Sequence, residues 1–211
     1  AAIIYYAAVI RSSRDPHLVT PGEKNEAAGR VERIIRAAAL LENNRIDEAI
    51  EIYRSLVQDD PRDASSYRNL AVATVAKVQD QAKKVNELAQ IDRASEETRA
   101  ARQALADWFA IADESVRKTI ELQPQDAAGY QLAVELVLQR IDQQPKALAD
   151  TNRRELMERI AGYLKTNPNN AYLASAMSDL LESLGGSREG WEQRTIDALT
   201  AAVEHQPRNL Y

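Results

Sequence analysis

The sequence predicts an all-α chain: an α-solenoid of stacked helix hairpins, with one long antiparallel hairpin projecting from it. Strong helix formers (alanine, leucine, glutamate, glutamine and arginine) dominate long stretches that contain no glycine or proline. Apolar residues recur there at spacings of three and four, as expected for a helix with one buried face. The stretches come in four pairs, and each pair ends in a short polar segment with a proline: QDDP, ELQP, KTNP and EHQP. Such recurrence is typical of a helical repeat array.

The first helix is predicted from Pro21 to about Glu42. Thr20 and Glu23 would form a capping box around Pro21, which suits the first helical position. Asn43 and Asn44 would then make a turn. Its expected inner face carries Val31, Ile34, Ile35, Ala38 and Leu41.

The second helix is predicted from Ile46 to about Gln58. It ends before Pro61, because the residue that precedes a proline avoids the helical region. Asp63 is the expected N-cap of the next helix. The inner face of the second helix would carry Ala49, Ile50, Tyr53, Leu56 and Val57.

Two unusually long helices are expected next, at about 64–92 and 95–122, each roughly 40 Å long at 1.5 Å per residue. They would pack against each other as the projecting hairpin. The residues expected between them are Val75, Val78, Ala82, Val85 and Ala89 on the first helix, and Ala101, Leu105, Trp108 and Ala112 on the second.

Two further pairs start near Asp126 and Asn170. The predicted organisation is an apolar N-terminal segment at 1–20 and an array over 21–211. Its units are expected at about 21–61, 62–124, 125–168 and 169–207. Residues 208–211, Arg-Asn-Leu-Tyr, resemble the opening of another repeat, so the natural array is expected to continue.

The N-terminal segment begins AAIIYYAAVI and is followed by Arg11 and Arg14. It has two interpretations: the trimmed end of a signal or anchor segment, or a helix or strand that packs on the array or on a second copy. If the segment with Tyr5 and Tyr6 is exposed, we expect its apolar surface to be buried against the array or against a second copy, so self-association is expected. The localisation stays open between a cytoplasmic protein and an exported or membrane-anchored one.

The first unit resembles a tetratricopeptide repeat. Six consensus positions of that family are matched by Ala37, Leu40, Ala49, Tyr53, Leu56 and Pro61. The run Tyr67, Asn69, Leu70 and Ala71 resembles the opening of the next repeat. The third unit matches more weakly, through Tyr130, Val134, Val137, Leu156, Ile160, Tyr163 and Pro168, and the fourth through Ala174, Ser178, Leu181, Thr195, Leu199, Ala202 and Pro207.

The resemblance implies a concave groove lined by the first helix of each unit. Carried over, the groove positions are Ser65, Arg68, Val72 and Val75, then Ala128, Gln131, Glu135 and Leu138, then Tyr172, Ser175, Asp179 and Glu182. Asn69 alone matches the Lys-Asn-Arg clamp with which some family members hold C-terminal carboxylates, because Ile34, Ala38, Ala128 and Leu132 stand at the other places. That kind of tail binding is therefore not expected.

Several function classes receive no support from the sequence. A net charge of −5 without a basic stripe argues against nucleic-acid binding. The absence of cysteine excludes disulfides, cysteine-bound zinc and thiol catalysis. His17 and His205 stand at opposite ends of the array, and the paired carboxylates are sequence neighbours that point apart. No catalytic residue, metal, cofactor or small-molecule substrate is therefore expected.

Three local features have ordinary structural explanations. Gly185, Gly186 and Ser187 fit a helix end followed by an N-cap, and they lack the spacing of a phosphate-binding loop. Trp108 and Trp191 are interpreted as core residues in preference to interface hot spots.

The predicted function is a non-catalytic scaffold that binds a partner protein or peptide through the groove, the projecting hairpin or both. The alternative is a docking or spacer domain of a larger enzyme, or of a secreted or membrane-anchored protein, whose catalytic part lies outside these residues. The flanking sequence would discriminate the two.

Overall fold

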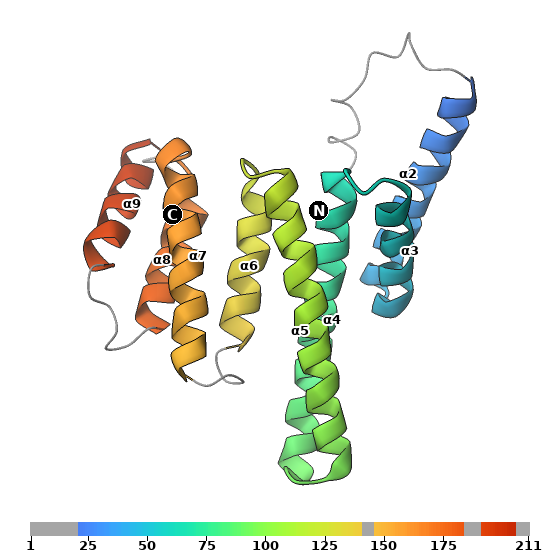
Figure 1. The fold of residues 1–211 in the computed structure, drawn as a ribbon, viewed down its shortest axis with the longest axis horizontal. Coiled ribbons are helices and arrows are strands. Elements are labelled where there is room, and N and C mark those ends of the chain that lie inside the picture. Colours follow the sequence, from blue (N-terminus) through green and yellow to red (C-terminus); the bar gives the residue numbers. More distant parts are fainter. Residues whose placement is uncertain (1–20, 141–145, 184–190, 206–211) are drawn as a thin grey trace.

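The protein is an all-α array, as the sequence predicts. The computed structural model describes residues 21–140, 146–183 and 191–205, and within these ranges it contains eight helices and no strand. Figure 1 shows the helices in one elongated row that runs from α2 to α9. The helices are α2 (Pro21–Glu42), α3 (Ile46–Asp59), α4 (Ala64–Ile91), α5 (Glu96–Leu122), α6 (Ala127–Arg140), α7 (Lys146–Thr166), α8 (Ala171–Ser183) and α9 (Glu192–His205).

The helices alternate between two roles. Each odd-numbered helix packs on the even-numbered helix that precedes it, and each hairpin also contacts the next along the chain. In addition, α4 packs on α6, and α6 packs on α8. We call α2, α4, α6 and α8 the A helices, and α3, α5, α7 and α9 the B helices. Contacts between neighbouring units are the defining feature of a solenoid, in which no single hairpin can bury its own apolar face.

The hydrophobic core is divided into three clusters along the array. Tyr53 lies in the first cluster, between α2, α3 and α4. Leu105 lies in the second, between α4, α5 and α6, and Met157 lies in the third, between α6, α7 and α8. Trp108 contacts the first and second clusters, whereas Ile120 and Ala133 contact the second and third. The core is therefore continuous, but only a few residues connect one cluster to the next.

The buried stripe of α2 differs from the predicted one. Ala37 and Leu40 are buried, whereas Ile35 is 61% exposed and Val31 and Ala38 are only half buried. The prediction that all five apolar residues face inward is therefore wrong. Within the described ranges α2 packs chiefly on α3, so only the side of α2 that faces α3 is covered.

The projecting hairpin is confirmed. Helices α4 and α5 have 28 and 27 residues, whereas the neighbouring α3 and α6 have 14 each. Figure 1 shows α4 and α5 extending together well beyond the rest of the row. Most of the predicted residues lie in the second cluster between these helices. The differences are that Phe109 is the buried aromatic, that Trp108 is half buried, and that Ala89 is half buried outside the cluster. At the tip, Ser95 caps α5 by accepting a 3.1 Å hydrogen bond from the Thr98 amide.

Asp63 caps α4, as predicted. Its carboxylate accepts hydrogen bonds from the amides of Ser65 (3.3 Å) and Ser66 (2.7 Å), and it also pairs with Arg30 on α2. We expect Asp63→Ala to lower the free energy of unfolding by about 1–2 kcal/mol. Asp63→Asn keeps an acceptor at the cap and should lose clearly less. Urea denaturation of both variants measures this, and equal losses would show that the cap is not the cause.

Several sequence predictions lie outside the described residues. They concern segment 1–20 with the Thr20 cap and His17, the 184–190 loop, and residues 206–211. The core role of Trp191 is confirmed, since it is 8% exposed in the third cluster. In the fourth unit Ser178 is exposed and Met177 fills the core in its place. No helix among the described residues is both long and apolar enough to cross a membrane.

Candidate functional site

The candidate groove residues lie on three adjacent A helices: Ser65, Arg68, Asn69 and Val72 on α4, Ala128, Gln131, Glu135 and Leu138 on α6, and Tyr172, Ser175, Asp179 and Glu182 on α8. Tyr172 is 50% exposed and Val72 39% exposed. All other candidates on α8 are exposed, and the four on α6 are half buried. We call the accessible surface of α4, α6 and α8 formed by these positions the A-helix face.

Asn69 does not belong to this surface. It is only 2% exposed, and it lies on the same side of α4 as Ser66 and Ala73, which are completely buried. Val75, which the family pattern also places in the groove, is 2% exposed in the second cluster. Neither side chain is accessible to a partner, because α4 packs on α3, α5 and α6 and these two side chains are buried.

Arg68 is held in an ion pair between two units. Its guanidinium lies 3.1 Å from the carboxylate of Asp126, just before α6. Asp126 also accepts a 3.0 Å hydrogen bond from the amide of Ala128, which caps α6. Since its charge is neutralised within the chain, Arg68 joins α4 to α6 and adds little positive potential to the A-helix face.

Three other candidates lie on α6 and α8, which pack against each other. Burial raises the pKa of the Glu135 carboxyl. The pKa of the Tyr172 hydroxyl is raised first by burial and then by the nearby carboxylates of Glu135 and Asp179. We call Glu135, Tyr172 and Asp179 the Tyr172 cluster. It combines a half-exposed aromatic ring with two carboxylates.

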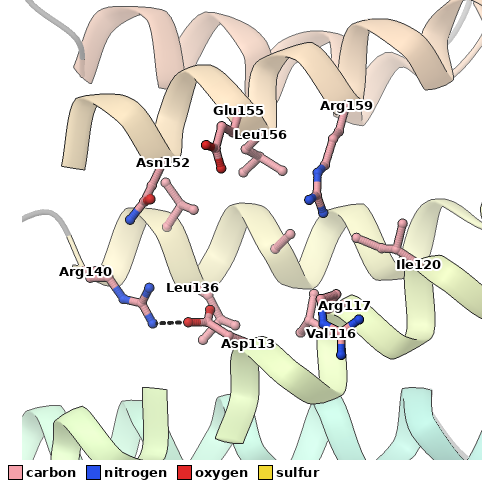
Figure 2. Close-up of a pocket in the computed structure, with 12 residues that line it drawn as sticks. Asp113, Val116, Arg117, Ile120, Leu136, Arg140, Asn152, Glu155, Leu156 and Arg159 are labelled. Atoms are coloured by element: carbon pink, nitrogen blue, oxygen red, sulfur yellow. Dashed lines mark hydrogen bonds and ion pairs between the residues drawn. The ribbon is translucent and has the colours of Figure 1, made fainter. Parts of the chain in front are cut away.

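A cleft that the sequence analysis missed lies among the B helices. Figure 2 shows side chains of α5 and α7 facing each other across α6. The cavity has a volume of about 240 Å³ and is lined in part by the apolar side chains of Val116, Leu136 and Leu156. A neighbouring cavity of about 490 Å³ shares Arg117, Ile120 and Arg159 with it.

Two of the arginines that line this cleft, Arg117 and Arg140, form ion pairs within the chain. Arg140 pairs with Asp113 at 2.5 Å, and its guanidinium lies 4.5 Å from the centre of the Phe109 ring. Hydrogen bonding to Glu114, supported by the charges of Glu114 and Glu121, raises the pKa of Arg117. The cleft therefore shows no clear preference for one sign of charge. In the sequence these residues look like an ordinary solvated helix face, which is why they gave no signal.

In the part of the chain that the structure describes, no arrangement of side chains typical of a metal or catalytic site is apparent. There, no group of three or more histidine, aspartate and glutamate side chains could hold a metal ion. The neighbouring carboxylates Asp113 and Glu114 pair with different arginines, Arg140 and Arg117. Converging carboxylates with separated pKa values, which acid–base catalysis needs, are not formed by this pair.

The paired helices and the divided core define a helical-repeat protein of the solenoid class. Residues 30–73 match the family model described as tetratricopeptide repeat. The match spans most of α2, all of α3 and the start of α4. Proteins of this family act in general as scaffolds for protein–protein interactions, and the repeats are generally non-catalytic.

Comparison with solved structures gives distant similarities. One is to the crystal structure of MamA protein, at 14% identity and a TM-score of 0.36, covering 84% of this chain and 92% of that one. Another is to YrrB, described as a TPR protein with an unusual peptide-binding site, at 13% identity and a TM-score of 0.32, covering 84% and 87%. The comparison with curated protein sequences gives no significant match.

Proposed function

We propose that this chain is a protein-binding scaffold whose A-helix face holds an extended segment of a partner protein. The observation that supports this most directly is the exposure of Tyr172 and Val72. A partner that covers large exposed side chains removes their apolar surface from water, which contributes favourable free energy to binding. Both lie at groove positions that the family resemblance implies, on the A helices α8 and α4.

Polar groups beside these two side chains could orient a peptide backbone. Gln131 on α6 offers an amide, and Ser175 on α8 offers an exposed hydroxyl. Peptide recognition commonly combines apolar anchors with a few such polar contacts. The Arg68–Asp126 ion pair would hold α4 and α6 in a fixed relative position. Less conformational entropy would then be lost when the partner binds.

The projecting hairpin is proposed as a second contact surface. Ile91, the last residue of α4, is 84% exposed at its tip. An apolar side chain at the far end of a long rigid hairpin is well placed to reach a partner that the A-helix face also holds. Binding at two places on one partner would raise the affinity through effective concentration.

The test uses peptides selected from a displayed random library on the wild-type chain. Val72→Tyr and Ser175→Tyr place bulky neutral side chains on the A-helix face, and each is expected to weaken binding at least tenfold. Ala110→Tyr changes an exposed alanine of α5 and serves as the matched control. Melting temperatures should be unchanged in all three variants. The proposal fails if no peptide is selected, or if Val72→Tyr and Ser175→Tyr bind as well as the control.

A further inference from the structure

We propose that the A-helix face selects a basic partner segment, and that the Tyr172 cluster receives a lysine or arginine side chain of that segment. This inference rests on the proposed function, because it names the chemistry of the partner for the same surface. It goes beyond the family resemblance, which implies a groove and leaves its ligand open.

The charges of the A helices α6 and α8 carry the first step, and Arg68 is the charged residue at the candidate positions of α4. Residues 127–139 of α6 and 171–183 of α8 contain Glu135, Asp179 and Glu182, and no lysine or arginine. The B helix α7, in contrast, carries five lysine and arginine residues and three aspartate and glutamate residues. Its cations are Lys146, Arg153, Arg154, Arg159 and Lys165, and its anions are Asp150, Glu155 and Glu158. Helix α7 therefore has an excess of positive charge, whereas the described A helices α6 and α8 carry only negative charge before Arg140.

Two arginines on the A helices α4 and α6 form ion pairs within the chain. Arg68 pairs with Asp126, and Arg140, at the end of α6, pairs with Asp113 on α5 and stacks on Phe109. Both ion pairs join neighbouring helices. A cation that a partner brings would therefore meet carboxylates that these two arginines do not neutralise.

The Tyr172 cluster supplies the contacts that a lysine or arginine side chain needs. A cation is attracted to the face of an aromatic ring, and it forms charge-assisted hydrogen bonds with carboxylates. Tyr172 is 50% exposed, so its ring is accessible. Asp179 is exposed about two helical turns further along α8, and Glu135 lies on α6, which packs on α8. Both carboxylates also contribute to raising the pKa of the Tyr172 hydroxyl. Burial also raises the pKa of Glu135, and a bound cation would offset the cost of keeping that carboxylate charged.

The experiment measures binding of two labelled peptides by fluorescence anisotropy at low and physiological salt. One peptide alternates alanine with arginine, and the other alternates alanine with glutamate. We expect the arginine peptide to bind the wild-type chain at least tenfold more tightly. The double variant Glu135→Gln/Asp179→Asn and the single variant Tyr172→Ala should each weaken its binding about tenfold or more.

A matched double variant, Glu192→Gln/Asp197→Asn, removes the same charge from exposed residues of the B helix α9. It should change the affinity less than twofold. If both double variants lose the same affinity for the arginine peptide, the net charge of the chain explains the binding and the inference is overturned. Equal or tighter binding of the glutamate peptide would also overturn it. Melting curves control for folding, and Glu135→Gln should not lower the melting temperature, because burial disfavours the charge that it removes.

The library selection separates this inference from the proposed function. Selected peptides that lose affinity in Val72→Tyr and Ser175→Tyr but carry no excess of lysine or arginine would leave the scaffold proposal standing and reject the basic partner. Arginine peptides that bind equally well to Val72→Tyr, Ser175→Tyr and the wild-type chain would reject both, because binding would then lie elsewhere.

Discussion

Replacing Tyr53 by alanine is expected to lower the free energy of unfolding by about 3–5 kcal/mol, the usual cost of removing a buried aromatic side chain. Tyr53 is 1% exposed and lies in the first core cluster with Ala37, Leu40 and Ile50. The ring fills space between α2, α3 and α4. Among the described helices, the α2–α3 pair has a neighbouring unit on one side only, so it cannot recover that contact elsewhere. We therefore expect the loss to be concentrated in the first unit.

Hydrogen exchange measured by mass spectrometry tests where the stability is lost. Amides of α2 and α3 should lose protection in Tyr53→Ala, while those of α7 and α8 keep it, because the third cluster shares no buried residue with the first. Tyr53→Phe keeps the ring and should stay much closer to the wild-type chain. A uniform loss of protection along the array would contradict this expectation and show that the units unfold together.

Replacing Leu105 by alanine is expected to cost about 2–5 kcal/mol. Leu105 is 1% exposed in the second cluster, where α4 and α5 pack against each other and against α6. This cluster lies between the other two, so its loss should both loosen the hairpin and weaken the connection between the ends of the array. Guanidinium denaturation should show a lower midpoint, and the transition should broaden if the two ends then unfold separately.

Ile91→Ala is the matched control for Leu105→Ala, because it also truncates an aliphatic side chain of the hairpin. Ile91 is 84% exposed, and its truncation should change stability by less than about 0.5 kcal/mol. If Ile91→Ala proves as costly as Leu105→Ala, the hairpin tip is buried in solution and the proposed contact surface there is wrong.

The sequence alone determined the positions of the helices. Pro61 and Asp63 marked the end of α3 and the start of α4, since proline restricts the residue before it and aspartate accepts from free amides. The long hairpin followed from an uninterrupted apolar spacing over 64–122, and its bounds agree with α4 and α5 to within one residue. These features are local, and the order of residues is enough to set them.

The tertiary structure decided which side of each helix is covered. Helical spacing indicates which residues share a side, but packing determines whether that side meets a neighbour. For this reason Ile35 is exposed and Asn69 is buried, against the sequence prediction. The Arg68–Asp126 ion pair joins residues 58 positions apart, and the Tyr172 cluster takes its residues from α6 and α8, which pack against each other. Such contacts depend on how the hairpins stack, which no local pattern specifies.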